Sequence, residues 1–304
     1  MIYTVTVNPA IDYVVQTDHL QLGLVNRLQH TNFIAGGKGI NVSKILNQLD
    51  CQNTAWGFLG GFTGQFLTTT LKNEQINSDF TSIADNTRIN VKLKSDQETE
   101  MNAAGPHVTE QELTAFKRQF EQVKAGDTVV FSGSLLPQLT NDFYLELIDL
   151  VVAQGAEFAI DTTGQALLDT LAKKPLVIKP NHHELADLFK TTLHNDEELL
   201  SYAAKLQQLG AKHVLISMAG AGAYYLSPEH IYHSAAPKGH VVNSVGAGDS
   251  MLAGFIGEFS KHQDPETAFK YGLACGSATA FTEDIATIDQ INALLPQIKI
   301  DLVK

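Results

Sequence analysis

The chain has 304 residues, of which 44% are hydrophobic and 18% are charged, and this is the composition of an ordinary globular protein. With 21 lysines and arginines against 33 aspartates and glutamates, the net charge of −12 disfavours nucleic acid and anionic membranes as partners, although a local basic pocket can still bind a small phosphate. Cys51 and Cys275 are isolated, which argues against disulfides and structural zinc. The N-terminus lacks a signal-peptide pattern and no apolar run is long enough to cross a bilayer, so we expect a cytoplasmic protein without a membrane partner.

Strand and helix patterns alternate along most of the chain. The first strand is expected at residues 2–7, and the helix that opens at residues 35–39 carries apolar residues three and four positions apart from Val42 to Leu49, the spacing of one buried face. This alternation predicts an α/β fold with three layers, in which helices cover both faces of a mainly parallel sheet. Further strands are expected at 55–59, 128–132, 158–161, 176–178 and 214–217, and further helices at 62–71, 110–123, 143–152, 165–171, 183–189, 197–209, 248–259 and 266–281.

Two stretches of the chain do not fit this alternation. Short β-type segments fall within about residues 10–34 and 87–103, and the polar and apolar residues of 88–93 alternate as in a half-buried strand. We expect these segments to form a small accessory sheet that acts as a lid. No linker, repeat or low-complexity segment is visible, so the whole chain, 1–304, is expected to be a single domain that carries these lid strands.

The stretch 243–255 is the strongest candidate for a functional site. Gly246, Ala247 and Gly248 lead directly into an expected helix, and small residues let an anion approach the unpaired N–H groups and partial positive charge of a helix N-terminus. Asp249 then lies where a phosphate would bind. It can accept a proton from a hydroxyl that attacks phosphorus, or it can merely cap the helix, and these residues alone leave both interpretations open.

A second glycine-rich helix start, at Gly37, carries a lysine, Lys38, and is also suited to an anion. Arg88 on an expected strand is another candidate for binding a substrate phosphate. For either cation taken alone, a solvated surface charge is the commoner explanation. Asp12 follows the first strand, where its carboxylate can hold sugar hydroxyls or serve as a turn residue.

Residues 179–184 follow an expected strand, at the end where open α/β sheets bind ligands. Asn181 and Glu184 stand three apart at a helix start and can orient waters around Mg²⁺, but the same spacing also fits a capping box. His182 and His183 are expected to be surface histidines rather than metal ligands, because adjacent residues on a helix point to different faces.

The glycines of residues 217–222 follow the next strand and can let a nucleotide lie against the backbone, although a plain hairpin explains them equally well. A P-loop is excluded, because no GxxxxGK[ST] sequence occurs. A nicotinamide-dependent oxidoreductase would have GxGxxG after the first strand, where this chain has Asn8-Pro9-Ala10.

Seven motifs in one order resemble the phosphofructokinase B group of ribokinase-like sugar kinases, over essentially the whole chain. Several motifs in order are more specific than any single one, and they favour functional roles for Lys38, Arg88, Asn181 and Glu184. The motifs are Asn8-Pro9-Ala10-Ile11-Asp12, Gly36-Gly37-Lys38-Gly39-Ile40-Asn41-Val42, Thr87-Arg88-Ile89-Asn90-Val91-Lys92, Ser132-Gly133-Ser134-Leu135, Lys179-Pro180-Asn181, Val245-Gly246-Ala247-Gly248-Asp249 and Gly276-Ser277-Ala278-Thr279-Ala280.

This resemblance implies a Rossmann-type core with a β-sheet lid, a homodimer formed through that lid, and the cofactors ATP and Mg²⁺. It implies phosphorylation of D-fructose 1-phosphate to fructose 1,6-bisphosphate, with tagatose 6-phosphate as the alternative acceptor. A non-catalytic sugar-phosphate sensor is disfavoured, because Asp249 and the glycines before it are present.

The resemblance also implies the role of each candidate residue: Asp249 as the base; Gly246, Ala247 and Gly248 as the anion hole; Asp12, Gly37, Lys38, Asn41, Arg88 and Ser134 facing the sugar phosphate; Lys179, Asn181, Glu184, Ser217, Gly220 and Gly222 on the side of ATP and Mg²⁺, with Glu184 reaching the metal through water.

Overall fold

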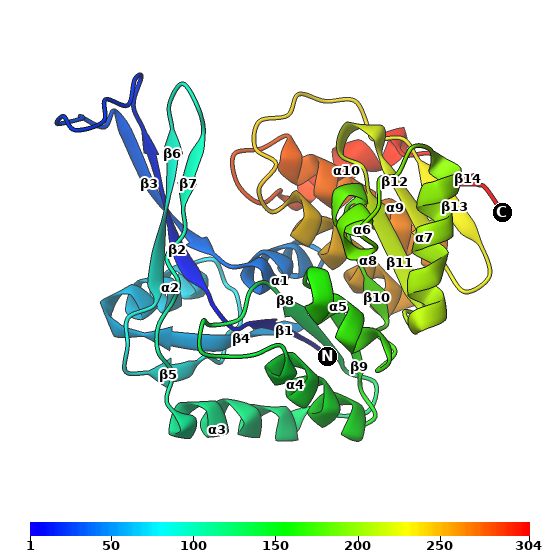
Figure 1. The fold of residues 1–304 in the computed structure, drawn as a ribbon, viewed down its shortest axis with the longest axis horizontal. Helices are drawn as coiled ribbons and strands as arrows, with labels where there is room; N and C mark the ends of the chain where they lie inside the picture. The colour runs from blue at the N-terminus through cyan, green and yellow to red at the C-terminus, as the bar shows by residue number, and fades with distance from the viewer.

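The computed structural model describes all residues from 1 to 304 and contains two β-sheets of different size (Figure 1). The large sheet has ten strands in the order β14-β13-β12-β11-β10-β9-β8-β1-β4-β5. Its strands are β1 (Ile2–Thr6), β4 (Asn53–Gly60), β5 (Thr81–Ile83), β8 (Thr128–Ser132), β9 (Glu157–Asp161), β10 (Val177–Ile178), β11 (His213–Ser217), β12 (Ala223–Leu226), β13 (Ile231–Ser234) and β14 (Asp301–Leu302).

Seven neighbouring strands of the large sheet, from β11 to β5, are parallel. Their centre is buried on both faces, which is why β1 and β8 are continuous apolar or β-branched runs rather than alternating ones. The chain then reverses through a short hairpin, so β12 is antiparallel to β11, β13 is antiparallel to β12, and β14 is antiparallel to β13. The mainly parallel sheet expected from the alternation is therefore present.

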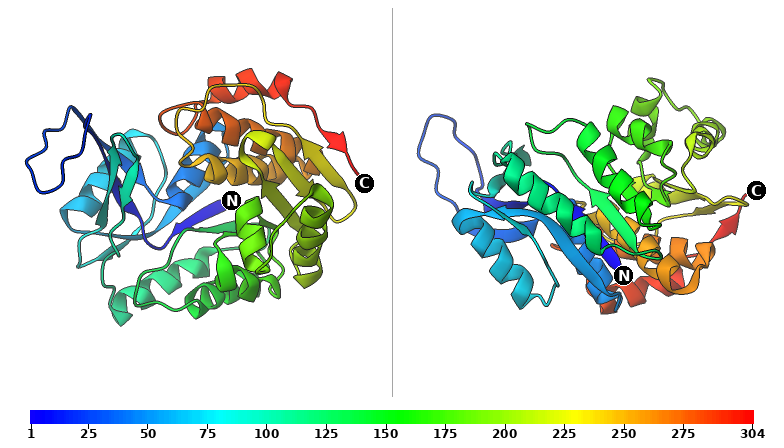
Figure 2. Two further views of the ribbon diagram at one scale, coloured as in Figure 1. Left: turned by 45° about the horizontal axis from the view of Figure 1, so that its top comes forward. Right: turned by 90° about the horizontal axis from the view of Figure 1, so that it is seen from below.

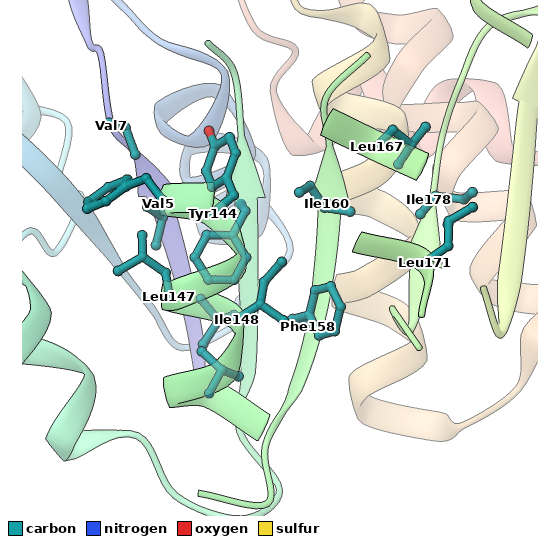
Figure 3. Close-up of a cluster of buried hydrophobic side chains, with 14 of the residues drawn as sticks. Val5, Val7, Tyr144, Leu147, Ile148, Phe158, Ile160, Leu167, Leu171 and Ile178 are labelled. Atoms are coloured by element: carbon teal, nitrogen blue, oxygen red, sulfur yellow. The ribbon is translucent and has the colours of Figure 1, made fainter. Parts of the chain in front are cut away.

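Helices cover the two faces of the large sheet and bury separate apolar clusters. Figure 3 shows part of the first cluster, which includes Leu147 of α4, Leu171 of α5, and Phe158 and Ile160 of β9. The helices on this face are α3 (Glu110–Gln119), α4 (Asp142–Ala153), α5 (Gly164–Leu171), α6 (His182–Leu188) and α7 (Asp196–Leu209), and those on the other are α1 (Lys38–Gln48), α8 (Ala247–His262), α9 (Pro265–Ala280) and α10 (Ile288–Leu294).

A separate four-stranded sheet, called the small sheet below, has the order β3-β2-β6-β7. Figure 2 shows it standing to one side of the large sheet, with the loop of residues 17–29 at its far end in dark blue. Helix α2 (Gly61–Asn73) and helix α1 pack beneath it through a third apolar cluster that includes Ile11 and Leu67. The strands of the small sheet are β2 (Ala10–Gln16), β3 (His30–Gly36), β6 (Arg88–Lys94) and β7 (Thr99–Met101).

Most elements lie where the sequence pattern predicts them, and the capping box of Thr109 and Glu112 at the start of α3 is present. The pattern did not predict β5, β12, β13, α10 or β14, which have three, four, four, seven and two residues. Such short elements carry too few residues for a period to be recognised. No helix has the length and apolar character needed to span a membrane.

Candidate active site

A pocket of about 1060 Å³ lies between the large sheet, the small sheet and the N-terminus of α8. Residues at or just beyond the carboxyl ends of five neighbouring strands line it: Thr6 at the end of β1, Ser132 at the end of β8, Asp161 at the end of β9, Lys179 after β10 and Ser217 at the end of β11. Parallel strands bring their carboxyl ends to one edge of the sheet, which is where open α/β sheets bind ligands.

The start of α8 forms one wall of the pocket. Gly246 is its N-cap with φ of 79°, a left-handed conformation that glycine adopts without strain. The main-chain N–H groups of Gly248 and Asp249 have no acceptor in the protein. A Cβ atom on Gly248 would lie 2.9 Å from Nζ of Lys179, so this ammonium group lies directly against the turn. Free N–H groups, a helix N-terminus and a lysine together make a site for an anion.

Asp249 lies in the first turn of α8 and is only 6% exposed. Burial and, after it, the negative charge of Asp161 raise the pKa of its carboxyl, Lys38 and a hydrogen bond from Asn41 lower it, and the net pKa is about 7. The carboxyl therefore titrates near neutrality, which suits a group that must accept a proton and later release it.

Asp161, which the sequence analysis did not assign to the site, is the second buried carboxylate of the pocket. Its Oδ2 lies 3.0 Å from Nζ of Lys38 and its Oδ1 lies 3.7 Å from Nζ of Lys179. Burial raises the pKa of Asp161, but the two lysines outweigh burial and hold it below its usual value. The two acids thus titrate apart, which suits Asp249 to accept a proton and Asp161 to keep its negative charge.

Two residues expected at the sugar phosphate contact this acidic pair instead of lying free. Nδ2 of Asn41 donates a hydrogen bond of 2.9 Å to Oδ2 of Asp249, and Nζ of Lys38 donates one of 3.0 Å to Asp161. Burial lowers the pKa of Lys38, but Asp161 and Asp249 outweigh it, so the net shift is upward and the ammonium stays charged. Both residues still line the pocket and can face a ligand with their remaining donors.

The opposite end of the pocket belongs to the small sheet. Arg88, at the start of β6, donates from Nη1 to the carbonyl of Ala103 at 2.9 Å and from Nη2 to the carbonyl of Asn8 at 2.8 Å. Burial lowers the pKa of Arg88, and Asp12 opposes that shift. Burial raises the pKa of Asp12, and a hydrogen bond of 2.9 Å from Nδ2 of Asn90 opposes it.

Buried polar atoms without partners gather around this pocket. Of six such side-chain atoms in the protein, four belong to residues that line it: Thr6 Oγ1, Asn8 Oδ1, Arg88 Nε and Ser132 Oγ. An unpaired buried polar atom costs about 1–3 kcal/mol, so a cluster of them indicates a place where a polar ligand completes the hydrogen bonding.

At the third side of the pocket, the capping-box interpretation of Asn181 and Glu184 is confirmed. Their side chains and backbone N–H groups form a capping box at 2.9 and 2.8 Å at the start of α6, and both residues line the pocket. Likewise, the glycines of residues 217–222 form the hairpin between β11 and β12, and Ser217, Gly220 and Gly222 of this hairpin line the pocket.

His182 and His183 do not diverge as expected. Their ring centroids lie 3.8 Å apart and both residues line the pocket. They occupy the first two positions of α6, where no preceding helical turn directs the side chains apart. No group of three or more His, Cys, Asp or Glu residues suited to a metal occurs.

A family model described as pfkB family carbohydrate kinase matches residues 4–290. The chain belongs to the pfkB family of carbohydrate kinases. The chain is 43% identical over 300 residues, 99% of each chain, to the 1-phosphofructokinase of Bacillus subtilis, and 36% identical over 301 residues, again 99% of each, to the D-tagatose-1-phosphate kinase of Bacillus licheniformis.

Solved structures of phosphofructokinase-2 from Escherichia coli, 27% identical to this chain, resemble this pfkB kinase in fold. The complex with fructose-6-phosphate superposes with a TM-score of 0.91 and the tetrameric inhibited form with 0.90, each over 97% of this chain and 98% of the other. The ribokinase-like fold that the resemblance implied is therefore present.

All sixteen residues singled out from the sequence line this one pocket of the pfkB kinase. Sequence reasoning missed Asp161, whose only signal is its place at the carboxyl end of a buried strand. It also missed residues 236–242, several of which line the pocket, because this loop has no periodicity. A Cβ atom on Gly239 of the loop would lie 2.1 Å from the ring of Phe281, so only glycine lets the loop lie on that ring.

Proposed function

We propose that this protein transfers the γ-phosphoryl group of ATP to D-fructose 1-phosphate and forms fructose 1,6-bisphosphate, in the cytoplasm, where ATP is available. The observation that carries the proposal is the buried Asp249 beside free N–H groups in a pocket of about 1060 Å³, which is large enough for both substrates. The similarity to a 1-phosphofructokinase supports the choice of sugar.

In the proposed mechanism, the ionised carboxylate of Asp249 accepts the proton of the sugar hydroxyl as its oxygen attacks the γ-phosphorus. The hydrogen bond from Asn41 orients this carboxylate. Negative charge on the transferred phosphoryl oxygens is stabilised by the N–H groups of Gly248 and Asp249 and by the ammonium of Lys179. Because these groups are already in position, they need no reorganisation during the reaction.

The residues of the pocket suit Mg²⁺ as the accompanying metal. Asp161 and Glu184 supply hard carboxylate oxygens to the pocket, and the absence of a larger ligand cluster fits an ion that takes one or two carboxylates together with waters and substrate phosphates. Glu184 would reach the ion through water, because one of its oxygens already accepts from the N–H of Asn181. When bound, the metal supplies charge neutralisation on the phosphates.

At the small sheet, Arg88 and Asp12 are proposed to bind the sugar phosphate, with Gly37, Lys38 and Ser134 completing the site. Arg88 keeps an unpaired Nε, and unpaired oxygens belong to three other residues that line the same pocket, Thr6, Asn8 and Ser132. A phosphate and several hydroxyls would satisfy these atoms, which an apolar ligand would not.

D-Tagatose 1-phosphate is a second candidate acceptor, because a relative of that name is 36% identical. Tagatose and fructose differ only in the configuration at carbon 4, so both 1-phosphates offer the same terminal hydroxyl to Asp249. Tagatose 6-phosphate, the alternative from the sequence, would have to lie the other way round, with carbon 1 at the base.

The test is a coupled assay of ADP formation with fructose 1-phosphate, tagatose 1-phosphate and tagatose 6-phosphate, each with ATP and Mg²⁺. We expect the highest kcat/KM for fructose 1-phosphate. A higher value for either tagatose phosphate would overturn the choice of sugar. If ATP is turned over with none of the three sugar phosphates, the proposal as a whole is overturned.

We further propose that the small sheet acts as a lid and that two copies of the chain associate through it. Its terminal loop exposes Leu22 and Val25 by 87% and 88%, and Leu24 by 66%, which is unusual for apolar residues of a monomer. Sedimentation velocity is expected to show a dimer that Leu22→Ser with Val25→Ser converts to a monomer, whereas a monomeric native protein would contradict the idea.

A further inference from the structure

A buried amide of the small sheet lies directly behind Asp12. Asn90 is 6% exposed and does not line the pocket. Strands β2 and β6 pair in parallel so that Asp12 and Asn90 are opposite residues in the register. Nδ2 of Asn90 donates a hydrogen bond of 2.9 Å to Oδ1 of Asp12, and Oδ1 of Asn90 accepts one of 3.1 Å from the N–H of Ala103.

These two hydrogen bonds determine which way the amide of Asn90 faces. Ala103 presents a donor and Asp12 an acceptor, so the side chain between them must accept on one side and donate on the other. A carboxylate can only accept, a hydrocarbon can do neither, and glutamine is one methylene too long for opposite residues of paired strands. An asparagine therefore fits this position because it accepts from Ala103 and donates to Asp12, a requirement that the alternation of the strand does not predict.

The loop after β7, which contains Ala103, also contacts Arg88. The carbonyl of Ala103 accepts from Nη1 of Arg88, and the carbonyl of the next residue, Ala104, accepts from Nδ2 of Asn8. Asn90 thus ties Asp12 to the loop that orients Arg88, and the two groups proposed to bind the sugar phosphate belong to one hydrogen-bonded unit.

We infer that Asn90 is a positioning residue for sugar-phosphate recognition: it fixes one oxygen of Asp12 and leaves the other, Oδ2, to read a sugar hydroxyl. This inference rests on the proposed function. Oδ2 of Asp12 lies against Gly36, where a Cβ atom would be 2.4 Å away, so the carboxylate is held on both sides. A carboxylate held in this way discriminates between hydroxyl configurations, whereas one that rotates can accept from either.

The first experiment replaces Asn90 by two side chains of similar size. Asn90→Leu removes both hydrogen bonds. Asn90→Asp keeps the oxygen that accepts from Ala103 but replaces the N–H donor that faces Asp12 with a carboxylate oxygen. Each variant is expected to raise the KM for fructose 1-phosphate about tenfold or more, with less than about a threefold change in kcat and in the KM for ATP. Asn102→Leu, an exposed amide on the same sheet that contacts Lys92 and not Asp12, is the control.

The preference between sugars and the effect of pH separate positioning from a purely structural role. The ratio of kcat/KM for fructose 1-phosphate to that for tagatose 1-phosphate is expected to fall several-fold in Asn90→Leu. The Asn90→Asp defect is expected to shrink as pH falls, because two adjacent carboxylates then share a proton. An unchanged ratio together with a defect independent of pH would overturn the inference.

A double-mutant cycle with Asp12→Asn decides whether Asn90 acts through Asp12. We expect Asn90→Leu to raise the KM for the sugar phosphate by no more than about twofold when residue 12 is already substituted. If the fold increases in KM of the two single variants instead multiply in the double variant, and thermal melting shows that each variant is folded, the inference is overturned and the proposed function stays intact. Failure of the unsubstituted protein to phosphorylate any of the ketohexose phosphates would instead overturn the proposed function itself.

Discussion

The two ends of the pocket use acidic residues in opposite ways. At the core end, Asp249 and Asp161 come from a helix start and a strand end, and lysines and burial drive their pKa values apart. At the end of the small sheet, Asp12 is held by an amide from the neighbouring strand. The core end is thus suited to control protonation, and the small sheet to control orientation.

This difference has a physical origin. The core end lies where several parallel strands and a helix N-terminus converge, so charges from distant parts of the chain meet in a buried space with strong electrostatic coupling. The small sheet has only four strands, and its residues are linked by hydrogen bonds between neighbours. Substitutions at the core end should therefore act mainly on kcat, and those at the small sheet mainly on KM.

The largest expected effect comes from the core end. Asp249→Asn keeps the size of the side chain but removes the base, so kcat should fall about 10²- to 10⁴-fold. Sugar-phosphate affinity, measured by calorimetry, should change little. Asp289→Asn alters an exposed acid in the first turn of α10, away from the pocket, and should leave kcat unchanged. A near-normal kcat for Asp249→Asn would show that the base is misassigned.

At the other end, Arg88→Ala should raise the KM for the sugar phosphate by about tenfold or more, because a charged contact is lost, while kcat stays within a few-fold. Lys94→Ala, at the far end of the same strand, is the matched control. Lys38→Ala should affect both parameters, since it also leaves Asp161 with Lys179 as its only ion-pair partner. If steady-state kinetics show an unchanged KM for Arg88→Ala, the claim that substitutions at the small sheet act mainly on KM is contradicted.

The pH dependence sharpens the comparison further. The ionised form of Asp249 is the active one and its pKa is about 7, so kcat/KM for the sugar phosphate should fall as pH decreases through that value. The hydrogen bond from Asn41 favours the ionised form, and Asn41→Ala should move this decline to higher pH. Asn47→Ala, on the same helix but outside this pocket, should leave the profile in place. A profile unaffected by Asn41→Ala would contradict the assignment.

The smallest effect concerns stability. Gly246→Ala places a side chain at φ of 79° and within 2.9 Å of Ile285, so the free energy of unfolding should fall by about 1–2 kcal/mol. Gly220→Ala meets no atom within 4 Å and is the control. Urea denaturation measures both. Equal stability of the two variants would mean that the start of α8 can adjust without cost.

Local patterns were enough to predict most of the fold. The helix face from Val42 to Leu49 and the alternating strand at 88–93 each depend on residues a few positions apart, and each is present. The glycines before Asp249 likewise marked a helix start with unpaired N–H groups, because these groups depend on the local backbone alone.

The sequence by itself determined the three-layer α/β core, the glycine-rich helix starts and the set of polar residues available for chemistry. Only the tertiary structure decided that Asp161 lies between Lys38 and Lys179, that Asn41 contacts Asp249, and that Asn90 stands behind Asp12. The residues in these contacts are far apart in the sequence: Asp161 and Lys179 are 18 positions apart, and Asn41 and Asp249 are 208 positions apart. No periodicity reports such separations, and the pKa values and orientations of the acids depend on them.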